Sequence, residues 1–169
     1  TPAARRQRRP HQPVFVSTME TQTPPPGRSA LYERVETSFK RQGMMQHLGA
    51  KLDRVAVGEV VLTLPFSDKV TQQQGTFHGG AIGALADIAG GYAGLTQAPE
   101  GAEVVSVEYK INFLSSKAGG VLRAVGRVTK PGRRLIITTA EVSHVADDGS
   151  TVPCAIMQQT LAVVPKLPE

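Results

Sequence analysis

The segment from Gly79 to Leu95 constrains the fold of this chain more than any other, because it combines a long apolar run with a marked start. At 100° per residue one side of it carries apolar residues, namely Ile82, Leu85, Ile88, Ala89, Tyr92 and Leu95. The opposite stripe holds small residues and one acid, namely Gly83, Ala84, Asp87, Gly90, Gly91 and Gly94. This pattern predicts a long, mostly buried helix that carries a single carboxylate.

The glycines on this stripe require an explanation, because each lowers the stability of a helix by about 0.5–1 kcal/mol relative to alanine. Close packing against strands is one explanation. Room for a slender ligand beside the helix backbone is the other. The sequence leaves both open.

The residues that precede the helix suggest chemistry. His78, Gly79 and Gly80 lie at its expected N-terminus, where unpaired backbone N–H groups and the helix dipole suit an oxyanion or a polarised carbonyl. Asp87 follows two turns later, where a carboxylate is placed to activate water. Taken alone, His78 fits a capping histidine and Asp87 a hydrogen-bonded buried acid. Together they fit a hydrolytic site.

The other elements follow from turn residues and from alternation of apolar residues. Ser29 is placed to cap a helix that runs through Phe39 to about Met44. Residues 51–64 are expected to form two short strands or one bent hairpin. Four strands are expected at 104–114, 121–130, 135–145 and 152–164. The connections at 115–120, 131–134 and 146–150 are short, so consecutive strands should pair antiparallel. The order predicts an α+β fold, with an antiparallel sheet wrapped on one principal helix.

Length and charge set the domain organisation. The 169 residues suffice for one domain, expected at 29–165, with a short tail at 166–169. Residues 1–28 are basic and Pro-rich, and we expect a disordered leader, with organelle targeting, a docking arm or an artefact as alternatives. Arg5, Arg6, Arg8 and Arg9 precede the first acid, Glu20, and removing these four from the 19 basic residues leaves 15 against 14 acidic ones. This balance argues against a nucleic-acid-binding face.

The sequence lacks the motifs of several other classes of protein. Cys154 is the only cysteine, so no disulfide framework exists, and it is expected as a small core residue. No membrane-spanning run is present, and we expect a cytoplasmic protein. The histidines are scattered and offer no metal-ligand spacing, so no metal is expected. No Gly-x-Ser-x-Gly motif or phosphate-binding glycine loop appears.

The motif His78-Gly79-Gly80, followed after six residues by Asp87, resembles the hotdog-fold acyl-CoA thioesterases of the phenylacetate-degradation (PaaI-like) type. The resemblance spans about residues 31–164. It implies a curled antiparallel sheet around one long helix, and a homodimer or homotetramer whose active sites are shared between subunits. It implies as substrate an aryl- or fatty acyl-CoA and requires no cofactor, since CoA is part of the substrate.

The resemblance also implies roles for particular residues. Asp87 would activate water, or attack the thioester directly, and the Gly79 N–H would hold the thioester oxygen. His78 would shape the helix start, and Ser106 of the neighbouring subunit would assist the water. Strand parity alone places Ser106 on a solvent face. Gln72 stands where several relatives carry Asn, and its role is open.

Further contacts to the substrate are expected from Gly80 and from the basic turn that contains Lys130, Arg133 and Arg134. This turn is either a solvated hairpin tip or a contact for CoA phosphates. A non-catalytic acyl-CoA-binding module is the main alternative function. A hotdog hydratase or dehydratase is less favoured, because it would need an Asp and a His both poised for proton transfer.

Overall fold

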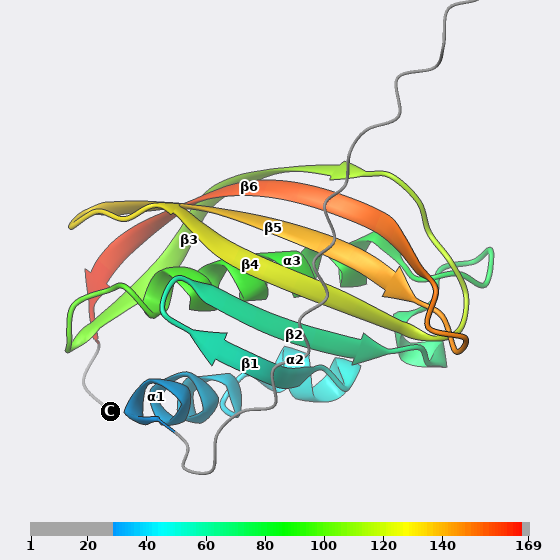
Figure 1. Ribbon diagram of the computed structural model, residues 1–169, viewed down its shortest axis with the longest axis horizontal. Helices are drawn as coiled ribbons and strands as arrows, with labels where there is room; N and C mark the ends of the chain where they lie inside the picture. The colour runs from blue at the N-terminus through cyan, green and yellow to red at the C-terminus, as the bar shows by residue number, and fades with distance from the viewer. Residues whose placement is uncertain (1–28, 167–169) are drawn as a thin grey trace, which may run out of the picture.

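The computed structural model describes residues 29–166, which form two short helices, a six-stranded sheet and one long helix (Figure 1). The elements are α1 (Ala30–Phe39), α2 (Gly43–Leu48), β1 (Lys51–Ala56), β2 (Glu59–Pro65), the 3-10 turn η1 (Asp68–Val70), α3 (Gly79–Leu95), β3 (Ala102–Phe113), β4 (Val121–Lys130), β5 (Leu135–Val145) and β6 (Thr151–Pro165). The predicted leader at 1–28 and most of the tail, residues 167–169, lie outside the described residues.

The first predicted helix is wrong in one respect, since residues 29–48 form two helices. Ser29 caps α1 as expected, and its Oγ accepts a hydrogen bond from the Tyr32 N–H at 3.2 Å. The chain turns after Phe39, and α2 ends at Gly49, whose φ of 83° is left-handed. The break allows Phe39 and Met45 both to reach the core, where they are 8% and 1% exposed.

The sheet has the strand order β1-β2-β4-β5-β6-β3, and every neighbouring pair is antiparallel. The predicted hairpins β1-β2, β4-β5 and β5-β6 are confirmed. The prediction that β3 pairs with β4 is wrong, because β3 pairs with β6 from Ala102↔Pro165 to Phe113↔Ala155. The connection after β3 crosses the end of the sheet beside the start of α3, where the Phe77 N–H donates to the Lys117 carbonyl at 3.0 Å.

Helix α3 lies along the inner face of the curled sheet (Figure 1), and two of its glycines are explained by packing. A Cβ on Gly90 would lie 2.3 Å from Gln159 Oε1, and one on Gly94 would lie 2.3 Å from Leu161 Cδ1. Gly91, by contrast, has no neighbour within 4 Å of a Cβ and lines a pocket. Both explanations that the sequence left open therefore apply, at different glycines.

Gly126 on β4 sets how closely α3 approaches the sheet. A Cβ there would lie 2.1 Å from the Ala89 carbonyl oxygen, which is helix backbone and cannot move aside alone. We expect Gly126→Ala to lower the free energy of unfolding by about 1–3 kcal/mol, measured by urea denaturation. Gly43→Ala is the matched control, because nothing lies within 4 Å of its Cβ. A Gly126→Ala protein as stable as this control would contradict the packing argument.

Cys154 is fully buried, as expected of a small core residue. Within residues 29–166, no helix is both long and apolar enough to cross a membrane. The same part of the chain holds no group of three His, Cys, Asp or Glu side chains arranged to bind a metal ion.

Candidate active site

The start of α3 presents one unpaired backbone donor. His78 is the N-cap residue, and its Nδ1 accepts a hydrogen bond from the Gly80 N–H at 2.8 Å. His78 thus caps the start of α3, and the Gly80 N–H is used in this cap. The Gly79 N–H makes no hydrogen bond within the described part of the chain. The Gly79 N–H can therefore donate a hydrogen bond to a ligand oxygen at the positive end of the helix dipole.

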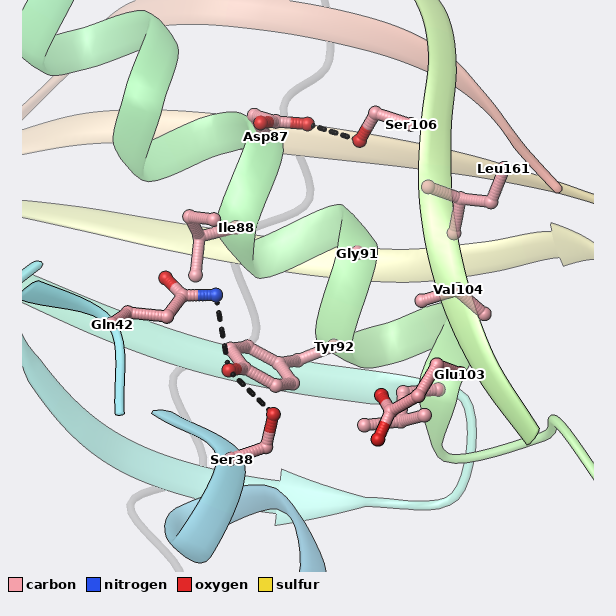
Figure 2. Close-up of a pocket in the computed structure, with 11 residues that line it drawn as sticks. Ser38, Gln42, Asp87, Ile88, Gly91, Tyr92, Glu103, Val104, Ser106 and Leu161 are labelled. Atoms are coloured by element: carbon pink, nitrogen blue, oxygen red, sulfur yellow. Dashed lines mark hydrogen bonds between the residues drawn. The ribbon is translucent and has the colours of Figure 1, made fainter. Parts of the chain in front are cut away.

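Asp87 lies two turns further along α3, half-buried, at the head of a pocket (Figure 2). Ser106 on β3 donates a hydrogen bond from its Oγ to Asp87 Oδ1 at 2.7 Å. Both residues belong to the same chain. The expectation that Ser106 serves the Asp87 of a neighbouring subunit is therefore corrected: the pair forms within one subunit.

Ser106 faces inward because β3 contains a bulge. Ser106 pairs with Leu161 and Glu108 pairs with Thr160, so β3 advances two residues while β6 advances one. The extra residue, Val107, shifts the alternation of the strand. Strict alternation placed Ser106 with Glu108 on a solvent face, and the bulge is the physical reason why that assignment fails.

Gln159 on β6 completes the surroundings of Asp87 and was not predicted. Its side chain is fully buried, and its Nε2 donates to Asp87 Oδ1 and, at 2.8 Å, to Ser106 Oγ. The sequence contains a weak indication that Gln159 is buried, because it falls at alternate positions with the apolar Met157 and Leu161 and so points to the same face of the strand. A polar side chain on a buried strand face needs a buried partner.

The pocket beside Asp87 has a volume of about 220 Å³. It is walled by Ile88, Leu95 and Val104. It runs along α3 past Gly91 (Figure 2). Its far end is polar, since Ser38, Gln42, Tyr92 and Glu103 line it. The pocket therefore joins a carboxylate at one end to hydrogen-bonding groups at the other.

The polar end is organised by the Tyr92 hydroxyl, which donates to Ser38 Oγ at 3.2 Å and accepts from Gln42 Nε2 at 3.1 Å. Burial raises the pKa of the Tyr92 phenol, while the hydrogen bond to Ser38 opposes the shift. The phenol therefore stays neutral at physiological pH. The Ser38 proton and the Gln42 Oε1 atom have no partner within residues 29–166 and remain available to a ligand.

The remaining predicted residues lie apart from this pocket. Gln72 is in the loop before α3, where its Nε2 donates to Thr76 Oγ1 at 2.9 Å and to Gln74 Oε1 at 3.1 Å. The basic turn is at the exposed tip between β4 and β5. Arg134 in this turn comes four residues before Thr138 and is therefore about 13 Å from Thr138 along the strand. Thr138 in turn contacts Gln159, which binds Asp87.

Gly79 and Asp87 do not meet within one chain. They are eight residues apart on the same helix, which is about 12 Å at 1.5 Å per residue. A water on Asp87 must lie about 3 Å from a carbonyl carbon to attack it. The two groups therefore make no direct contact within one chain.

Comparisons with known proteins agree with this architecture. The family model of the thioesterase superfamily matches residues 74–150, from the loop before α3 to the turn before β6. A thioesterase family protein from Silicibacter pomeroyi has a similar structure, with a TM-score of 0.77 and 36% identity over 80% of this chain and 99% of that one. The E. coli PaaI protein from the phenylacetic acid degradation operon shares the fold, with a TM-score of 0.70 at 21% identity over 79% of this chain and 93% of PaaI.

A Saccharolobus solfataricus protein that is provisionally named an esterase is 32% identical over 108 residues, which cover 63% of this chain and 76% of that one. The curled six-stranded sheet on one long helix confirms the expected hotdog architecture. On these grounds the chain belongs to the thioesterase superfamily and has its hotdog fold.

Proposed function

We propose that the chain hydrolyses the thioester bond of an acyl-CoA, with Asp87 as the base that activates water. One observation carries the proposal: Asp87 lies at the head of the pocket with Oδ1 held by Ser106, while Oδ2 has no partner within residues 29–166. A carboxylate oxygen in this state can accept a proton from water. Membership of the thioesterase superfamily supports the choice of a thioester as the bond that is cleaved.

The reaction balances with no added reactant. Asp87 takes a proton from water while the water oxygen bonds to the thioester carbon, and the carbonyl oxygen becomes an oxyanion. The oxyanion collapses, the C–S bond breaks, and the proton passes from Asp87 to the departing CoA sulfur. The products are a carboxylic acid and free CoA, so CoA acts as part of the substrate and no cofactor is required.

The oxyanion needs a donor, and because Gly79 and Asp87 of one chain lie about 12 Å apart along the helix, we place this donor on a second chain. In our proposal Asp87 of one subunit faces the Gly79 N–H of the partner subunit, so each active site is shared. A backbone N–H at a helix N-terminus suits this task, because it needs no reorganisation when charge develops. His78 and Gln72 hold the helix start and its loop, and do not react.

The edge strand β3 is the surface that we propose for pairing the subunits. Four large apolar side chains on it are exposed by 46–59%, namely Val105, Val107, Tyr109 and Phe113. An edge strand of 12 residues that carries such side chains is open to pairing with a second copy. The dimer is the minimum assembly that this proposal requires, and a tetramer is compatible with it.

The pocket favours a compact acyl group that ends in a hydrogen-bonding substituent. A cavity of about 150 Å³ holds benzene, so 220 Å³ accommodates a substituted ring more readily than a long fatty chain. Tyr92 follows Asp87 by five residues, or about 7.5 Å along the helix, which spans one aromatic ring. Ser38 and Gln42 then meet a ring hydroxyl, while Lys130 and the other basic residues of its turn are candidates to contact CoA phosphates.

This substrate assignment predicts a preference that depends on Ser38. We expect kcat/KM for an aryl-CoA with a distal ring hydroxyl to exceed that for its unsubstituted analogue by about tenfold, the worth of one hydrogen bond. Ser38→Ala should abolish this ratio and change kcat/KM for the unsubstituted substrate by less than about threefold. Free-thiol release on both substrates measures it. An unchanged ratio in the variant would remove Ser38 from the specificity site.

A further inference from the structure

Gln159 is a polar side chain in an apolar part of the core. It is fully buried on β6, between the inward-facing Met157 and Leu161. A buried amide is costly unless its hydrogen-bonding groups are paired, and all of those of Gln159 are paired. The Nε2 group reaches Asp87 Oδ1, Ser106 Oγ at 2.8 Å and the Asp87 backbone carbonyl at 3.3 Å.

Thr138 sets the orientation of this amide. The Thr138 hydroxyl on β5 is fully buried and donates to Gln159 Oε1 at 2.9 Å. If the amide were reversed, its carbonyl oxygen would face the Asp87 carboxylate and repel it. The chain from Thr138 through Gln159 to Asp87 therefore has one favourable arrangement.

Gly90 provides the space for the amide. A Cβ at this position would lie 2.3 Å from Gln159 Oε1 and 2.9 Å from Thr138 Oγ1. These are side-chain atoms, so an alanine here must displace the hydrogen-bonded pair itself. The glycine is thus explained by the position of the amide, although it costs helix propensity.

We propose that Gln159 is a positioning residue for the general base, which rests on the proposed function of Asp87. Gln159 and Ser106 both donate to Oδ1, which opposes rotation of the carboxylate and leaves Oδ2 without a partner within residues 29–166. Gln159 itself is not among the residues that line the pocket, so it acts through Asp87 and does not touch the acyl group. Thr138 and Gly90 support it, so that two sheet strands and the helix together align one oxygen.

The test compares variants that differ only in these hydrogen bonds. Gln159→Met keeps side-chain length and removes both donors, and Thr138→Val removes the hydroxyl at constant shape. We expect each to lower kcat by about 10- to 100-fold with KM changed less than about threefold, because misplacement of a base affects the chemical step. Thr138→Ser keeps the hydroxyl and should stay within about threefold of the parent kcat. Circular dichroism melting confirms that each variant is folded at the assay temperature.

A double-mutant cycle separates positioning from general damage to the fold. Gly90→Ala alone should lower kcat by a similar 10- to 100-fold factor, because its methyl group displaces the amide. In a Gln159→Ala background the amide is absent, so adding Gly90→Ala should change kcat by less than about threefold. Equal effects of Gly90→Ala in both backgrounds would overturn the role of Gly90.

The outcomes also distinguish this inference from the proposed function. If the parent hydrolyses acyl-CoA and Asp87→Asn abolishes turnover, while folded Gln159→Met keeps the parent kcat, only the positioning role is overturned. If Gln159→Met raises KM at constant kcat, it contacts substrate, and the positioning role is again wrong. If the parent itself releases no thiol from a broad acyl-CoA panel, both proposals fail together.

Discussion

Replacing Asp87 with asparagine is expected to lower kcat for acyl-CoA hydrolysis by at least about 10²-fold, the scale of losing a general base. The substitution preserves shape, and the asparagine oxygen can still accept the hydrogen bond from Ser106. The fold and the affinity for substrate should therefore persist. Steady-state kinetics with free-thiol detection measures kcat, and isothermal calorimetry measures acyl-CoA binding to the variant.

Asp147→Asn is the matched control, because Asp147 is an exposed acid in the turn between β5 and β6. It removes the same charge and should leave kcat unchanged. If Asp87→Asn kept a near-normal kcat, the assignment of the base would be wrong. If the parent bound acyl-CoA tightly without turnover, the alternative of a non-catalytic binding module would take the place of hydrolysis.

Gly79→Pro is expected to lower kcat by about 10²–10³-fold, because it deletes the backbone N–H proposed to stabilise the oxyanion. Proline is tolerated at the first position of a helix, and His78 already has the extended backbone that a following proline requires. Gly79→Ala retains the N–H, and its Cβ would make an ordinary 3.5 Å contact with the Phe113 ring. The alanine variant should keep kcat within about threefold, so the contrast isolates the N–H.

Mixing subunits tests whether the site is shared. Gly79→Pro and Asp87→Asn protomers that exchange freely should regain about a quarter of the parent activity, because half of the dimers are mixed and each has one intact site. Ser106→Ala mixed with Asp87→Asn should regain nothing, since these two residues act within one chain. Mass spectrometry confirms mixed dimers. Mixed dimers of the first pair without recovery would show that the two groups do not cooperate across the interface.

The helix that carries the site was predictable, because its signals are local. The start at Gly79 and the apolar side with Leu85 follow from spacing within one element.

 The end of this helix, at Leu95, agrees with the predicted boundary. The turns at 131–134 and 146–150 likewise predicted the two hairpins that form one half of the sheet. Local geometry decides these features, so no knowledge of distant contacts was needed.

The partner of β3 was not predictable in the same way. The short connection at 115–120 suggested pairing with β4, yet β3 lies beside β6 at the opposite edge of the sheet. A connection of this length can form a hairpin or cross the end of a sheet, and burial of the whole apolar surface decides between them. The bulge at Val107 is a similar case, because nothing in the strand sequence marks it.

The sequence by itself determined that a carboxylate and a helix start with a free N–H lie on one helix, and that this helix is the core of an α+β fold. Only the tertiary structure decided what surrounds the carboxylate. Asp87 meets Ser106 at a separation of 19 residues and Gln159 at 72, and the second contact requires β6 to lie under the helix at Gly90. Alternation along a strand tells which side chains point inward. Which of them meet depends on strand order, register and the close approach of helix to sheet, and these are properties of the whole packed chain.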